Sequence, residues 1–174
     1  MNDKAARQPV ELRHRDAAPR RMTQLSRGEA LRLLGSVSLG RIVFTQQALP
    51  AIRPVNHVMD GEDIVVRLHD GATLASIAAP SGAPGIVVAY EADIIDPETH
   101  LGWSVVVTGY ARLVSDPVEL DRYERELQPW VAQSMKHALR IQPDLVTGFQ
   151  LVTEPAAATN GSTPGAGHGP AARV

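Results

Sequence analysis

The chain has 174 residues, of which 44% are hydrophobic, so it is long enough for one domain with a substantial core. Its formal net charge is -2 and its pI about 6.3, which gives no electrostatic reason to bind nucleic acid or an anionic membrane. The absence of cysteine excludes disulfides, thiolate nucleophiles and cysteine-ligated metals. We therefore expect a small molecule or another protein chain as the partner, and neither nucleic acid nor membrane.

Both ends of the sequence are predicted to be flexible. Residues 1–22 form a basic, polar arm without the apolar run of a signal peptide, and residues 154–174 form a tail rich in Ala, Gly and Pro. No apolar stretch approaches the ~20 residues that span a bilayer. We expect a cytoplasmic protein with one folded domain over residues 23–153.

The predicted domain opens with a short helix and continues with short strands. Ser26 and Glu29 have capping-box spacing at the helix start. Strand patterns follow at 41–45, 51–59 and 64–68, separated by short breaks rich in polar and turn-forming residues. Strands that follow one another this closely favour antiparallel pairing.

A short helix at 73–79 is predicted to lead into two longer strands, 85–95 and 102–114. Both strands are rich in Val and Ile. Alternate residues of the second strand, beginning with Trp103, share an apolar face. We expect that face to pack in the core and the opposite face to be partly solvated or to contact a partner.

A third helix is predicted where Asp116 and Glu119 form another capping box around Pro117, and it should end before Pro129. A fourth helix is expected over 130–138.

The last element is expected to be a strand region over 139–152, interrupted by Pro143 and Gly148. The absence of long crossover helices favours an antiparallel barrel over a doubly wound sheet.

Familiar catalytic and nucleotide-binding motifs are missing. The sequence contains no glycine-rich dinucleotide loop, no P-loop and no G-x-S-x-G elbow. The six histidines show no metal-ligand spacing; His57 and His69, on neighbouring predicted strands, are the one pair that would allow a metal, and we expect none.

Two polar clusters interrupt the predicted strands, at 53–56 and at 67–73. The second ends where a helix begins, and free N–H groups at a helix start beside an arginine form an anion site. A phosphate-bearing cofactor would fit there. The residues alone equally allow Arg53 and Arg67 to be exposed strand residues, which is the simpler interpretation.

Several segments occur in an order that carries a family resemblance. They are GRIV at 40–43, PAIRPVNH at 50–57, IVVR at 64–67 followed by Gly71, VVAYEAD at 87–93, GWSVVVTG at 102–109, RIQP at 140–143 and TG at 147–148. Over about residues 25–152 the chain resembles the pyridoxamine 5'-phosphate oxidase-like FMN-binding split-barrel family, in the branch that includes nitroimidazole reductases. The resemblance implies a mainly β fold with flanking helices, a six-stranded antiparallel split β-barrel, which forms a homodimer and binds FMN in a groove shared by the two protomers.

The resemblance also implies the cofactor-binding residues. They are Arg53, Pro54, Val55 and Asn56 beside the isoalloxazine ring; Arg67, Leu68, His69, Asp70, Gly71 and Thr73 near the phosphate; Glu91, Trp103 and Ser104 from adjoining strands; and Trp130, which would close the site from the neighbouring subunit. No catalytic residue is implied, because a flavin itself carries the hydride or electron. His57 or His69 would be the candidates for delivering a proton.

Two positions depart from the family pattern. Thr73 stands where family members usually have lysine, and Arg67 stands where the nitroimidazole-reductase branch tends to have histidine. The substrate motif of the true pyridoxamine-phosphate oxidases is also missing, so vitamin B6 oxidation is not expected. The predicted function is an FMN-dependent oxidoreductase acting on an unknown small organic substrate. The alternatives are an F420- or heme-binding split barrel and a non-enzymatic flavin-binding module.

Overall fold

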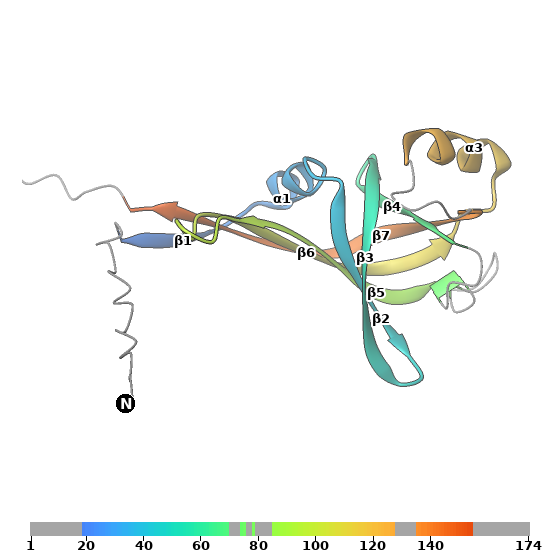
Figure 1. Cartoon of the computed structure of the whole chain (residues 1–174), viewed down its shortest axis with the longest axis horizontal. Helices are drawn as coiled ribbons and strands as arrows, with labels where there is room; N and C mark the ends of the chain where they lie inside the picture. The colour runs from blue at the N-terminus through green and yellow to red at the C-terminus, as the bar shows by residue number, and fades with distance from the viewer. Residues whose placement is uncertain (1–18, 70–73, 76–77, 79–84, 128–134, 155–174) are drawn as a thin grey trace, which may run out of the picture.

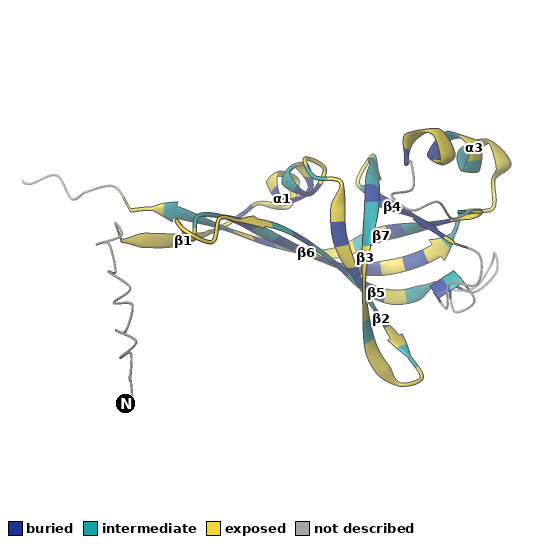
Figure 2. Cartoon of the chain, viewed as in Figure 1, coloured by how far each residue is buried: buried dark blue, intermediate teal, exposed yellow. Residues whose placement is uncertain are grey.

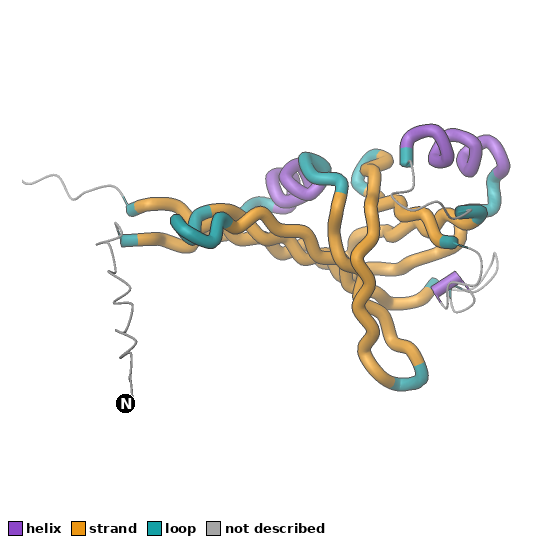
Figure 3. The backbone as a smooth tube through the Cα atoms, in the orientation of Figure 1, coloured by secondary structure: helices purple, strands orange, loops and turns teal. Residues whose placement is uncertain are grey.

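The computed structural model describes residues 19–69, 74–75, 78, 85–127 and 135–154 (Figure 1). The elements are β1 (Arg20–Gln24), α1 (Arg27–Leu34), β2 (Leu39–Gln46), β3 (Leu49–Asp60), β4 (Asp63–Leu68), β5 (Ile86–Ile95), β6 (Gly102–Leu113), α3 (Pro117–Glu126) and β7 (His137–Thr153). Strands dominate, and α1 and α3 lie on the same side of them in this view (Figure 3). The prediction of a mainly β fold with flanking helices is confirmed.

One antiparallel sheet contains all of these strands, in the order β1-β7-β4-β3-β2-β5-β6. An additional pairing of β7 with β6 joins β6 back to the sheet, so β2 to β7 form a closed ring and β1 lies outside it. The seam between β2 and β5 is short, because only residues 41–43 pair with residues 89–91. The sheet is therefore a barrel that opens along one seam, in agreement with the predicted split barrel.

Strand β6 shows how the sequence builds the ring. Trp103, Val105 and Val107 are buried, whereas Val106 and Tyr110 on the other face are exposed. Successive side chains of a strand point to opposite faces, so the alternation fills the barrel on one face and leaves the outer face accessible. The β2–β3 hairpin and β1, by contrast, extend from the ring with much of their surface exposed (Figure 2).

Helix α1 covers part of β6 and β7, and its start follows the predicted cap. The Glu29 N–H donates to Ser26 Oγ at 3.3 Å. Gly148 on β7 allows the close approach, since a Cβ there would lie 3.1 Å from the Ala30 side chain.

Helix α3 also begins as predicted, with Pro117 in its first turn. The Val118 N–H donates to the Asp116 carboxylate at 2.8 Å, so the side chain of Asp116 satisfies one of the unpaired donors at the helix start.

Two element predictions are wrong. The flexible arm is predicted to extend through residue 22, but Arg20–Gln24 form β1, which pairs with the end of β7. The helix expected over 130–138 does not reach its predicted end, because Met135 and Lys136 are not helical and β7 starts at His137. Residues 128–134 lie outside the described part of the chain, as does most of the helix expected over 73–79.

Strand β7 is longer and more continuous than expected. It runs from His137 to Thr153 through both Pro143 and Gly148. The proline is accommodated by a register shift, since Thr108 pairs with Leu145 while the next residue, Gly109, pairs with Pro143. A bulge removes the need for a ladder N–H that proline lacks.

Candidate functional site

The arginine predicted to bind phosphate lies on the outer face of β4, beneath α3. Only 8% of Arg67 is exposed. Its guanidinium donates to the Leu127 carbonyl at 3.4 Å, to Glu124 Oε1 at 3.3 Å and to the Met135 carbonyl. Arg67 therefore holds helix α3 and the start of the β7 region against the sheet, and these partners occupy donors that a phosphate would need.

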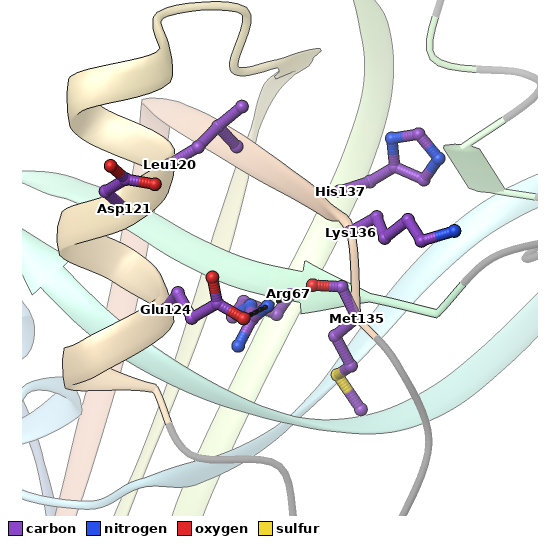
Figure 4. Close-up of a pocket in the computed structure, with 7 residues that line it drawn as sticks. All are labelled: Arg67, Leu120, Asp121, Glu124, Met135, Lys136 and His137. Atoms are coloured by element: carbon purple, nitrogen blue, oxygen red, sulfur yellow. Dashed lines mark hydrogen bonds and ion pairs between the residues drawn. The ribbon is translucent and has the colours of Figure 1, made fainter.

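A pocket of about 240 Å³ opens beside Arg67, between α3 and the start of β7 (Figure 4). Asp121 and Glu124 line it from the helix, and Lys136 and His137 line it from the other side. The pocket therefore has an acidic wall and a basic wall with a buried guanidinium between them.

The predicted ring-binding segment of β3 divides between two faces. Arg53 and Val55 lie on the same inner face of β3 as His57, because alternate residues of a strand share a face, while Pro54 and Asn56 lie on the outer face. Val55 packs against the core, but Arg53 is exposed because the β2–β3 hairpin extends beyond the ring. The Arg53 Nη1 donates to the adjacent Ile52 carbonyl at 2.8 Å.

Glu91 also lies on the outer face, in a row with Pro54 and Arg41 across three strands. Arg41 Nη1 lies 3.0 Å from carboxylate oxygens of both Glu91 and Asp93. Burial, together with the neighbouring Asp93 carboxylate, raises the pKa of Glu91, although the hydrogen bond from Arg41 opposes the shift. Arg41 and Asp93 also line a shallow groove of about 550 Å³ at the C-terminal end of β5.

Trp103 and Ser104 point in opposite directions. Trp103 is 8% exposed and belongs to the barrel core, whereas Ser104 is paired with Asp93 on the outer face. Leu68 is likewise a core residue.

Five of the ten predicted site residues that the structure describes carry their side chains on the outer face of the ring. The outer-face residues are Pro54, Asn56, Arg67, Glu91 and Ser104. His69 follows the end of β4, while Asp70, Gly71, Thr73 and Trp130 lie outside the described residues. These five residues come from different strands around the ring, and Arg67 is covered by α3. Their roles as cofactor ligands stay predictions.

A buried polar network inside the barrel was not predicted. His57 is 4% exposed; its Nε2 lies 3.0 Å from the Leu34 carbonyl and its Nδ1 2.8 Å from the Tyr90 hydroxyl. These partners require the tautomer in which Nε2–H donates to Leu34 and Nδ1 accepts from Tyr90. Gly40 makes room, since a Cβ there would lie 2.4 Å from the Tyr90 hydroxyl. His57 is therefore a core residue with both ring nitrogens satisfied, which argues against a role in proton delivery.

Among the described residues, no group of three or more His, Cys, Asp or Glu side chains is arranged to hold a metal ion. The described helices, with 8 residues in α1 and 10 in α3, are too short to cross a membrane, and no other helix in that part of the chain does so.

Comparisons with known proteins agree with this fold. Residues 26–150 match the model of the pyridoxamine 5'-phosphate oxidase family. The chain is 46% identical over 146 residues to "Uncharacterized protein Rv0080" of Mycobacterium tuberculosis, covering 84% of this chain and 96% of that protein.

Two solved structures are similar as well. The FAD binding protein from Mycobacterium smegmatis shares 40% identity and a TM-score of 0.58, covering 72% of this chain and 97% of the other. A FAD-binding protein from Mesorhizobium loti has a TM-score of 0.60 at 18% identity, covering 77% of this chain and 99% of the other, and this likeness concerns the fold alone. On the family match over most of its length, the chain belongs to the pyridoxamine 5'-phosphate oxidase family.

Proposed function

We propose that the protein binds a flavin and uses it as an oxidoreductase acting on a small organic substrate in the cytoplasm. The observation that carries this proposal is the 40% identity to the FAD binding protein from Mycobacterium smegmatis, 97% of which is covered. A bound flavin would supply the hydride or electron transfer, and the chain's own residues would bind and orient it.

The residues on the outer face fit such a group. Asn56 and Ser104 provide hydrogen-bonding side chains on the outer faces of β3 and β6, and Arg41 on β2 and Lys136 just before β7 provide cations. A flavin needs polar contacts at the edge of its ring and positive charge at its phosphate, and both are present.

FMN is the proposed form of the flavin, and FAD is the second candidate because of the description of the Mycobacterium smegmatis relative. Heat release of the cofactor from purified protein, followed by chromatography against FMN and FAD standards, separates the two. We expect FMN. Release of F420 or heme instead would contradict flavin binding, since each has its own absorption bands.

Enzymatic activity needs a separate measurement. Addition of NADH or NADPH to the loaded protein under anaerobic conditions should bleach the flavin absorption. A non-enzymatic flavin-binding module would be favoured if neither NADH nor NADPH reduces the flavin and if no candidate organic acceptor reoxidises the flavin after a chemical reductant has reduced it.

We also propose that the protein forms a homodimer through the outer face of β5, β6 and β7. Apolar side chains cluster there and are 36–62% exposed: Val87, Val106, Tyr110, Leu145 and Phe149. Exposed apolar patches of this kind mark interfaces, and a second copy would bring the same face opposite the outer-face residues of the predicted site.

Light scattering after size exclusion tests the dimer. Wild-type protein should have twice the 18.7 kDa mass of the chain, and Leu145→Arg should shift it toward monomer. Val118→Arg is the matched control, because Val118 is 77% exposed on α3, away from this face. A wild-type monomer at micromolar concentration would contradict the proposal.

A further inference from the structure

We propose that the two protomers of the homodimer cross with their β6 strands antiparallel, so that Glu91 and Asp93 of one protomer pair with Arg112 of the partner subunit. This inference rests on the proposed homodimer. It adds the orientation of the two subunits and the charged contact that determines it.

The outer face of β5, β6 and β7 changes in character along the strands. Strand pairing sets its side chains in rows, namely Asp93 with Ser104 and Phe149, Glu91 with Val106 and Thr147, Ala89 with Thr108 and Leu145, Val87 with Tyr110 and Gln142, and Arg112 with Arg140. The first two rows hold the carboxylates, the exposed apolar side chains occur from the first row to the fourth, and Arg112 is exposed in the last row. The face therefore has an acidic end, an apolar middle and a basic end.

The acidic end carries a net negative charge. Arg41 Nη1 lies 3.0 Å from a carboxylate oxygen of Glu91 and 3.0 Å from one of Asp93, so one guanidinium serves two carboxylates. The side chains of Glu91 and Asp93 are 26% and 33% exposed, so part of their hydration is already lost. A second protomer that covers them removes more water, and burial of the remaining negative charge is costly unless the partner supplies a cation.

The basic end can supply that cation. Arg112 is exposed on the outer face of β6, two residues beyond Tyr110 of the apolar middle. It has contacts within its own subunit, but a guanidinium has five donors and can keep such contacts while it donates to a carboxylate of a second copy. The two ends of the face therefore complement each other in charge.

Twofold symmetry decides which arrangement of two copies joins these ends. An axis that runs across the strands, at the row of Ala89, Thr108 and Leu145, reverses the order of the rows. The row of Asp93 then faces the row of Arg112 of the partner subunit, and the apolar rows between them face each other. An axis along β6 would leave the order unchanged, set Arg112 against Arg112 of the partner subunit, and cover the carboxylates without a cation. Contact between like charges opposes that second arrangement.

Charge reversal tests the orientation, with the dimer dissociation constant measured by sedimentation equilibrium at pH 8, well above the ordinary pKa of a carboxyl group. Asp93→Lys turns the single negative charge of the acidic end into a positive one, and Arg112→Glu makes the basic end negative. Each should weaken the dimer by about tenfold or more, because like charges then meet twice in every dimer. The double variant Asp93→Lys/Arg112→Glu exchanges the charges of the two ends and should recover most of the wild-type affinity.

Arg32→Glu is the matched control. It makes the same change of charge at an exposed position of α1, which packs against the inner side of β6 and β7, and it should leave the dissociation constant unchanged. Circular dichroism verifies the folding of every variant. If the folded single variants dimerise as wild type does, or if the double variant is weaker than either of them, the inference is wrong while the homodimer stands. A wild type that remains monomeric overturns both.

Discussion

At the scale of single residues, His57 shows how a side chain that looks reactive in the sequence serves the core. Both of its ring nitrogens are bonded, and together with Tyr90 and the Leu34 carbonyl it links β3, β5 and the end of α1. Gly40 makes the contact possible, because any larger residue would place a Cβ against the Tyr90 hydroxyl.

Burial lowers the pKa of His57 below its value of about 6.5 in an unfolded chain. The folded state thus favours the neutral ring. Its contribution to stability is fully present above about pH 6.5 and is lost as the pH falls below that value, because the unfolded chain then binds the proton more readily.

His57→Gln should therefore flatten the acid side of the stability profile. Glutamine offers an amide donor to Leu34 but does not titrate in this range. We expect the Tm of wild type to fall more steeply than that of the variant between pH 7 and pH 5. His100→Asn, at an exposed turn position with φ 55°, should follow the wild-type curve. Parallel profiles for wild type and His57→Gln would contradict the role assigned to the buried ring.

Arg67 is expected to matter for stability. Arg67→Ala removes the donor of two backbone carbonyls and of Glu124, so it should lower the free energy of unfolding by about 1–3 kcal/mol. Arg53→Ala is the matched control on the neighbouring strand, and because Arg53 is exposed it should change stability by less than about 0.5 kcal/mol. Equal effects of the two substitutions in urea unfolding would show that Arg67 is not a structural clamp.

The candidate residues could be found from the sequence. The face of the sheet toward which each side chain points could be predicted for only some of them. Polar residues inside strand patterns marked Arg53, Asn56 and Arg67, and the family resemblance implied Glu91. The sequence could not show that Arg67 is covered by α3, since that contact joins residues 57 positions apart. Trp103 was expected at the site, yet its own alternation pattern placed it on the core face, and the structure agrees with the pattern.

At the scale of elements, helix α3 is held on the barrel by a polar network around Tyr123. Its hydroxyl donates to Asp60 Oδ2 at 2.5 Å and accepts from Arg140 at 2.5 Å and from Arg122 at 2.8 Å. Burial raises the pKa of Tyr123 to about 12, so the hydroxyl remains protonated at neutral pH and can donate. The network connects the β3–β4 turn, β7 and the helix.

Tyr123→Phe keeps the buried ring and removes only the hydroxyl. Asp60 then loses a donor beside two arginines, and we expect a loss of about 1–2 kcal/mol in the free energy of unfolding. Val118→Ala, at an exposed position on the same helix and away from the proposed dimer face, should cost much less. Chemical denaturation of the two variants at one protein concentration checks the difference, and equal losses would mean that the network does not anchor α3.

Most elements followed from local signals in the sequence. Alternating Val and Ile and turn residues located β2 to β6 to within about two residues, and the capping boxes located the starts of both described helices. Strand β1 was missed because all five of its residues are exposed and carry no apolar alternation; only its pairing with β7 defines it. The continuity of β7 was missed because the bulge that accommodates Pro143 depends on the partner strand.

At the scale of the whole molecule, the ring has a filled interior and a partly apolar outer face. The interior is closed by residues such as Tyr90, Val107 and Ile141, which are fully buried. On the outside of the ring, the exposed apolar cluster of β5, β6 and β7 lies beside Glu91 and Ser104. The barrel and the outward face of the 102–114 strand were predicted from the sequence, whereas the order of the strands and the short β2–β5 seam depend on long-range pairing and came from the structure.

The visible absorption spectrum of the purified protein, before and after titration with FMN and FAD, tests flavin binding most directly. We expect flavin bands in the protein as isolated, or saturable uptake of FMN by colourless protein with quenching of flavin fluorescence. A colourless protein that takes up neither FMN nor FAD, while remaining folded, would contradict the central claim.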